Sequence, residues 1–153
     1  MKFLELKVHP LIIEFVTAGL MWALAKAIPG YPLPHFIAVL GFLTFAIAGC
    51  VLVQMGKWRF GQHQTTHNPT RPESASALVT GGIYGITRNP MYLGMLLILV
   101  GWSIYLSSMA AFLALLIYVF YLNMFQIKPE EEALKKLFGK DYEDYCQRVR
   151  RWL

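Results

Sequence analysis

The sequence predicts an all-α, polytopic membrane protein with about four transmembrane helices and a cytoplasmic, helical C-terminal segment. Of the 153 residues, 56% are hydrophobic, and the mean hydropathy of +0.45 is high for a water-soluble domain of this size. Four apolar runs reach or approach the roughly 20 residues that cross the hydrocarbon core of a bilayer. They span residues 10–28, 33–55, 90–106 and 109–127. The length suits a single domain that covers residues 1–153.

The first run, residues 10–28, carries two charged side chains, Glu14 and Lys26. Lys26 lies near the end of the run, where a long side chain can reach the membrane surface. The run is too long for a removable signal peptide and has no small-residue cleavage site, so we expect a retained transmembrane helix.

The positions of the basic residues predict how the helices are oriented. The connectors 29–32 and 107–108 contain no Lys or Arg. Basic residues instead lie before residue 10, in the loop 56–89 and after residue 127. Because cytoplasmic loops are enriched in Lys and Arg, we expect both termini and the loop 56–89 to be cytoplasmic. The net charge of +5 is explained by basic residues beside the membrane that contact anionic lipid, so no nucleic-acid partner is expected.

The loop 56–89 contains Gly, Pro, Asn and Thr and is expected at the membrane surface, either as a cover for a site or as a plain connector. His63 and His67 have helical spacing but lack an acidic partner, so no metal site is predicted. Cys50 lies in a transmembrane run and Cys146 in the tail, so we expect them to lie far apart and predict no disulfide between them.

Residues 78–94 combine a glycine-rich turn with a helix start. Gly81, Gly82 and Gly85 do not follow a strand, so they do not form a dinucleotide-binding loop. Asn89 is a good N-cap residue and suits the position before Pro90, which starts the helix. Arg88 then lies at a helix N-terminus, where its guanidinium and the free N–H groups favour an anion such as a carboxylate.

A second polar cluster follows the fourth apolar run. Asn123, Gln126 and Glu130 fall on one helical stripe, and polar groups at this depth are costly unless they face protein or water. A hairpin of two transmembrane helices, turning at residues 107–108, places this stripe beside Arg88, Asn89 and Tyr92. We therefore expect the two clusters to form one site.

The C-terminal segment, residues 129–152, is expected to form cytoplasmic helices. Pro129 begins or kinks the first one, and three glutamates occupy its first turn. Gly139 ends it, and Asp141 caps a last helix. One face of that helix carries Tyr142, Tyr145, Val149 and Trp152. This amphipathic helix lies either on the membrane or over the site.

Both clusters resemble the signature of a known superfamily of integral membrane enzymes. Residues 78–94 resemble the LVTxGxY…RHPxYxG segment of the isoprenylcysteine carboxyl methyltransferases and phospholipid methyltransferases. The second half of the signature corresponds here to Glu130-Glu131, Leu134, Phe138-Gly139, Tyr142, Tyr145, Val149 and Arg151-Trp152. The resemblance covers residues 78–152, whereas residues 1–60 match only as transmembrane helices. It also implies a bacterial or archaeal cytoplasmic membrane.

The resemblance implies that S-adenosylmethionine binds at the cytoplasmic end of the hairpin. Leu78 and Val79 would contact the cofactor through the backbone, and Tyr84 and Tyr92 would flank its adenosyl or sulfonium part. Glu130 would bind the ribose or the ammonium. The other residues expected at the cofactor are Arg88, Asn89, Pro90 and Asn123. The residues expected to be catalytic are Arg88, Asn89, Tyr92 and Glu131.

The sequence does not decide which chemical group accepts the methyl group. The isoprenylcysteine branch has His where this chain has Asn89, and the Arg-Asn-Pro form is more similar to the phospholipid branch. A carboxylate acceptor needs no base, whereas an amine or a thiol must lose a proton, for which Glu131, Glu132 or Tyr145 would serve. The resemblance implies a lipophilic acceptor, with an isoprenylcysteine-type carboxyl group as the default and a lipid amine as the alternative. A reductase and a non-catalytic ligand sensor are the competing classes, and the oligomeric state is not predicted.

Overall fold

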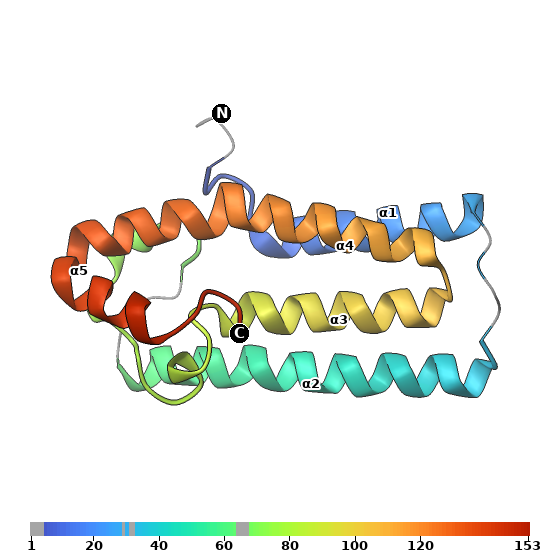
Figure 1. Ribbon diagram of the computed structural model, residues 1–153, viewed down its shortest axis with the longest axis horizontal. Helices are drawn as coiled ribbons and strands as arrows, with labels where there is room; N and C mark the ends of the chain where they lie inside the picture. Colours follow the sequence, from blue (N-terminus) through green and yellow to red (C-terminus); the bar gives the residue numbers. More distant parts are fainter. Residues whose placement is uncertain (1–4, 29, 31–32, 64–67) are drawn as a thin grey trace.

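The computed structural model describes residues 5–28, 30, 33–63 and 68–153, and within these residues all regular structure is helical (Figure 1). The four helices of the bundle are α1 (Pro10–Ala27), α2 (His35–Gln62), α3 (Pro90–Leu106) and α4 (Met109–Tyr121). A π-helical segment, η4 (Leu122–Ile127), joins α4 to α5 (Lys128–Arg148). Two short 3₁₀ turns, η2 (Pro72–Ser74) and η3 (Gly82–Gly85), lie in the connection between α2 and α3.

Three of the described helices are long and apolar enough to cross a membrane: α1, α2 and the continuous helix Met109–Arg148. The helix α3 is apolar but shorter, with 17 residues, which is close to the lower limit of roughly 17–25 residues for a crossing. The second helix extends beyond the predicted run 33–55. Residues 56–62, expected in a loop, continue α2 because they contain no Pro and because Gly56 is buried against Met91.

The centre of the bundle is α3, which lies between α2 and α4 in Figure 1. Helices α2 and α3 approach closely where two glycines face each other. A Cβ atom at Gly49 would lie 2.4 Å from the carbonyl oxygen of Gly94. Small residues at a helix interface let backbones approach and gain van der Waals contact, which is the main attraction available between helices in lipid. On the other side of α3, a core that includes Met21, Leu99 and Tyr118 joins α1, α3 and α4.

The outer faces of the bundle are apolar. Large exposed hydrophobic side chains cover α1, α2 and α4, for example Phe15, Phe36, Ile47, Leu116 and Phe120. A water-soluble monomer rarely exposes such continuous apolar surface. This distribution is that of an integral membrane protein whose outer faces contact lipid.

The helix that leaves the bundle changes its winding before Pro129. Proline has no N–H, and its ring clashes with the carbonyl group four residues earlier, which disturbs the α-helical hydrogen bonds. The π-helical segment η4 lies directly before this proline, so the helix continues through Pro129 with a changed winding instead of beginning there. Gly139 has φ 52°, and the predicted break at this residue is confirmed. The predicted end at residue 152 is wrong, because α5 ends at Arg148.

Candidate functional site

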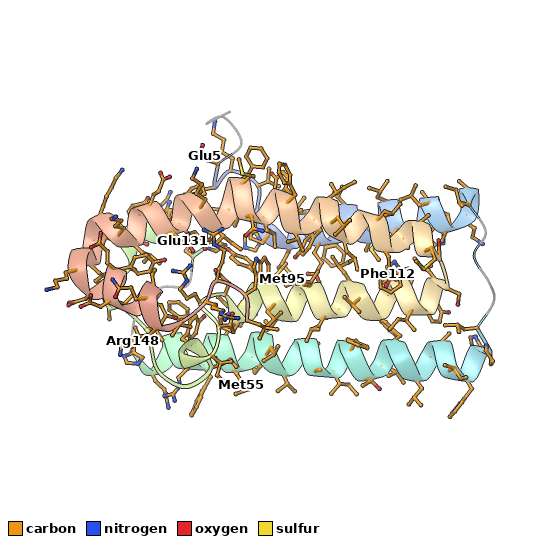
Figure 2. The ribbon with its side chains drawn as sticks, in the orientation of Figure 1. Glu5, Met55, Met95, Phe112, Glu131 and Arg148 are labelled. Atoms are coloured by element: carbon orange, nitrogen blue, oxygen red, sulfur yellow. The ribbon has the colours of Figure 1, made fainter. Side chains whose placement is uncertain are left out.

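A cavity of about 920 Å³ lies at the end of the bundle where α3 begins. Its walls come from the start of α1, the second half of α2, the connection before α3, the first turns of α3, and α5. Cavities that bind ligands of drug size measure roughly 300–1,000 Å³. In Figure 2, Glu131 lies between α5 and the start of α3, and Met95 lies on the side of α3 that faces away from α2; both residues line the cavity, whereas the exposed Met55 lies on the outer side of α2.

The residues predicted from the two sequence clusters converge on this cavity, with one exception. Those that line it are Leu78, Val79, Tyr84, Arg88, Asn89, Pro90, Tyr92, Glu130 and Glu131. Asn123 is not among the lining residues, and its side-chain oxygen accepts a hydrogen bond of 3.1 Å from Trp152 Nε1. Asn123 therefore lies apart from the other residues that were expected at the cofactor. The π-helical winding changes the angle between Asn123 and Glu130, which the α-helical spacing of the sequence could not show.

Glu130 is held by two donors from different elements. The Tyr92 hydroxyl donates to Glu130 Oε1 over 2.5 Å, and Gln126 Nε2 donates to the same oxygen over 2.6 Å. Gln126 also donates to the carbonyl oxygen of Pro69 over 2.6 Å, which fixes the loop before η2 to η4. Burial raises the pKa of Glu130 to about 7, although both hydrogen bonds favour the ionised form. The carboxyl group therefore titrates near neutral pH.

Glu131 joins two arginines. Its Oε1 accepts from Arg88 Nη2 over 2.9 Å, and its two oxygens accept from Arg151 Nε over 3.0 Å and from Arg151 Nη2 over 2.6 Å. One carboxylate thus faces two guanidinium groups, which leaves the cluster with a positive charge. The Nε atom of Arg88 is buried and has no hydrogen-bond partner among the described residues. A buried N–H without an acceptor is costly, so this group favours an added anion or carbonyl oxygen.

The C-terminal tail is tied to the start of α3. The carbonyl oxygen of Arg150 accepts from Arg88 N over 3.0 Å, and that of Arg151 accepts from Asn89 Nδ2 over 2.9 Å. Pro90 starts α3 and Asn89 is its N-cap residue, as predicted, but the Asn89 side chain makes no capping hydrogen bond. Its amide binds the tail instead, and this contact joins residues 62 positions apart in the sequence.

Three tyrosines close the polar end of the cavity. Tyr142 and Tyr145 are buried on α5, and the Tyr145 hydroxyl donates to the carbonyl oxygen of Tyr84 over 2.7 Å. The last helix was predicted to lie either on the membrane or over the site. In the structure it lies over the site. Burial raises the pKa of Tyr84, so its hydroxyl stays neutral, and it has no hydrogen-bond partner among the described residues.

The sequence did not indicate the contribution of α1 and α2. His9, which caps α1, lines the cavity together with Leu11 and Glu14 from α1 and with Gln54 and Lys57 from α2. Apolar periodicity cannot show which of two transmembrane helices faces a site. The one signal was the charge of Glu14 inside an apolar run, because ionisable groups in membrane helices usually face an interior.

No group of three or more potential metal ligands occurs in the part of the chain that the structure describes. His63 follows the end of α2, whereas His67 lies outside the described residues.

Comparison with known proteins gives a family match and several relatives. The phospholipid methyltransferase family matches residues 36–141. Protein-S-isoprenylcysteine O-methyltransferase B of Arabidopsis thaliana is 34% identical over 121 residues, covering 79% of this chain and 61% of that protein. Protein-S-isoprenylcysteine O-methyltransferase of Saccharomyces cerevisiae is 31% identical over 113 residues, covering 67% of this chain and 46% of that protein. An uncharacterised protein of Haemophilus influenzae is 46% identical over 63 residues, covering 41% of this chain and the whole of that protein. The chain thus spans about half of the length of the named relatives.

Proposed function

Because the chain belongs to the phospholipid methyltransferase family, we propose that it transfers a methyl group from S-adenosylmethionine to a lipophilic acceptor at the cytoplasmic face of a membrane. The observation that carries this proposal is the pair of buried polar groups without a partner, Arg88 Nε and Tyr84 Oη, in residues that line one cavity. Two buried donors without acceptors favour a polar ligand between them.

The chemistry of these side chains fits S-adenosylmethionine. Its carboxylate suits the Arg88 guanidinium, since a charge-assisted hydrogen bond there would pair the buried Nε. Its ammonium or ribose hydroxyls suit the Glu130 carboxylate, which already accepts from Tyr92 and Gln126 through Oε1. Its sulfonium suits the face of an aromatic ring, which Tyr84 and Tyr92 offer. Leu78 and Val79 complete the site through backbone contacts.

When bound, S-adenosylmethionine supplies an electrophilic methyl group, and the residues of the chain align the reactants and exclude water. Glu131 holds Arg88 and Arg151 in place through its two oxygens, so the cationic side of the site is preformed. Tyr142 and Tyr145 cover the polar end. Methyl transfer depends mainly on such alignment and desolvation of the nucleophile and the methyl group.

The apolar part of the cavity supports a lipophilic acceptor. Val53 from α2 and Met95 and Ile98 from α3 line it, and the exposed Cys50 lies at its edge. We propose that the acceptor enters from the lipid between α1 and α2, which pack on opposite sides of α3. The names of the plant and yeast relatives favour an isoprenylcysteine-type carboxyl group, and the family name favours a phospholipid.

We also propose that α3 crosses the membrane together with α1, α2 and α4, which places both termini in the cytoplasm of a bacterium or archaeon. A cysteine introduced at Ser107, between α3 and α4, would then react with a membrane-impermeant maleimide added outside spheroplasts. A cysteine at Glu73, in η2, would react only after lysis. Reaction of both from the same side would contradict this topology.

Calorimetric titration of the detergent-purified protein with S-adenosylmethionine tests the function. Saturable binding, followed by transfer of labelled methyl groups to extracted membrane lipids, supports a methyltransferase. Saturable binding without transfer to any acceptor would favour a ligand sensor, and no binding by the folded protein would overturn the proposal.

A further inference from the structure

A buried carboxyl group stands in the wall of the cavity on α1. Glu14 is 9% exposed and belongs to the inward-facing stripe of α1, together with Pro10, Thr17 and Met21. It also lines the cavity. The family match begins at residue 36, so neither the family nor its signature gives Glu14 a role.

The carboxyl group of Glu14 has no polar partner among the residues that the structure describes. Within residues 5–28, 30, 33–63 and 68–153 no hydrogen bond or ion pair involves its carboxyl group. The charge of Glu14 acts on Tyr118 of α4, whose hydroxyl is buried and has no partner among these residues. Lys57 of α2 lines the same cavity but makes no ion pair with it among these residues. A carboxylate within an apolar helix is costly unless it faces water or a partner.

The place of Glu14 suits the polar head of an acceptor. It lies five residues beyond His9, which is roughly 7 Å along the helix from the predicted cytoplasmic end. Apolar side chains that would hold an alkyl chain, Leu11, Met95 and Ile98, line the same cavity. An acceptor that enters from the lipid would therefore bring its head group to the level of this carboxylate.

We infer that Glu14 binds the amino group of the acceptor, and that the protein consequently selects a lipid amine over a lipid carboxylate. This inference rests on the proposed methyltransferase function. A carboxylate attracts an ammonium group and repels an acceptor carboxylate, and both effects are strong where water is excluded. The carboxyl group at Glu14 therefore determines specificity in addition to binding.

The reaction balances with Glu14 as the proton acceptor. The ammonium group of the acceptor passes one proton to the Glu14 carboxylate and becomes a neutral amine. The nitrogen lone pair then forms a bond to the methyl carbon of the donor while the bond from that carbon to sulfur breaks. The positive charge moves from sulfur to nitrogen, and the sulfur leaves as a neutral thioether. Release of the proton from Glu14 to water restores the carboxylate.

Two probes with the same alkyl chain test this inference, oleylamine and oleate. Their retention by the purified protein in mild detergent is measured by native mass spectrometry, and the transfer of labelled methyl groups to each is measured separately. We expect the wild-type protein to prefer oleylamine by about 30-fold or more, which is the effect of a buried charge pair. Glu14→Gln should abolish this preference and leave the affinity for S-adenosylmethionine unchanged.

The matched control is Glu73→Gln, which removes an exposed carboxylate that does not line the cavity. It should retain the preference of the wild type. Equal retention of the two probes by the wild type, a preference for oleate, or a Glu14→Gln protein that still selects oleylamine would overturn the inference. The wild-type comparison remains decisive if Glu14→Gln fails to fold. Failure of the proposed function is seen separately, as no binding of S-adenosylmethionine by the wild type.

Discussion

The Tyr92 hydroxyl donates to Glu130 Oε1 over 2.5 Å, and this bond joins the start of α3 to the start of α5. Through it, the two clusters that lie 38 residues apart in the sequence form one wall of the cavity. If Glu130 holds a cationic or hydroxyl group of the cofactor, Glu130→Gln should weaken the binding of S-adenosylmethionine by about 10-fold or more, since hydrogen bonds to charged groups contribute about 1.5–3 kcal/mol. Calorimetry measures this change. Circular dichroism should show an unchanged helix content, and undiminished affinity would exclude Glu130 from the site.

Arg88→Ala should also weaken the binding of the cofactor, because the buried Nε is the group that we assign to the cofactor carboxylate. Glu131 keeps Arg151 as a partner in this variant, so the fold should persist. S-adenosylmethionine and an analogue whose carboxylate is replaced by an amide separate this role from a structural one. The wild type should prefer the carboxylate form, whereas Arg88→Ala should bind both forms with similar affinity. An unchanged preference would contradict the assignment.

The affinity for S-adenosylmethionine should rise with pH. Glu130 has a pKa of about 7, raised by burial from 4.5, and the Tyr92, Tyr84 and Glu131 side chains face it. Below pH 7 the group is protonated and does not attract a cation, so binding should strengthen by up to about tenfold per pH unit toward pH 7 and then level off. Glu130→Gln should remove this part of the pH dependence. A wild-type profile identical to that of the variant would refute the prediction.

The raised pKa of Glu130 also affects the stability of the ligand-free protein. This stability should fall as the pH rises, whereas the affinity for S-adenosylmethionine should rise. Because the unfolded chain ionises Glu130 at about pH 4.5 and the folded protein only at about 7, the folded state binds more protons between these values. The contribution of Glu130 to stability is therefore full below pH 4.5 and is lost as the pH rises through 7. Thermal unfolding of the ligand-free protein in detergent should show this loss in the wild type and a weaker one in Glu130→Gln. Equal losses in both proteins would show that other groups cause it.

Gly49→Ala should destabilise the bundle, because its new Cβ would lie 2.4 Å from the carbonyl oxygen of Gly94. Overpacking of this kind costs about 1–3 kcal/mol. Gly19→Ala in α1 is the matched control, since no heavy atom lies within 4 Å of its Cβ position. The control should be neutral or stabilising by up to about 1 kcal/mol from helix propensity. Thermal unfolding compares the two variants, and equal midpoints would contradict the close packing of α2 on α3.

Tyr145→Phe should loosen α5 over the cavity. The substitution removes the Tyr145 hydroxyl, which donates a buried hydrogen bond of 2.7 Å to the carbonyl oxygen of Tyr84. Leaving a buried acceptor without its donor costs about 1–3 kcal/mol. Tyr105→Phe is the control, because Tyr105 is an exposed tyrosine that does not line the cavity. We expect faster trypsin cleavage in α5 of Tyr145→Phe only, and equal cleavage rates would disprove the prediction.

Much of the fold followed from local patterns, because apolar length and proline positions act within one segment. The start of α3 at Pro90 and the break at Gly139 are of this kind. The contacts that were not predicted join distant residues, such as Asn89 with the carbonyl oxygen of Arg151. Asn123 was misplaced because π-helical winding changes the angle between residues, which an α-helical stripe assumes to be constant. The role of α1 at the cavity depends on tertiary packing. The charge of Glu14 was the one feature of the sequence that indicated it.

The most direct test of the account is calorimetric titration of the detergent-purified wild type with S-adenosylmethionine and S-adenosylhomocysteine, beside Glu130→Gln. We expect saturable binding of both compounds to the wild type and clearly weaker binding of S-adenosylmethionine to the variant. Absence of binding to a folded wild-type protein, with or without a lipid acceptor present, would contradict the central claim that this cavity binds a methyl donor.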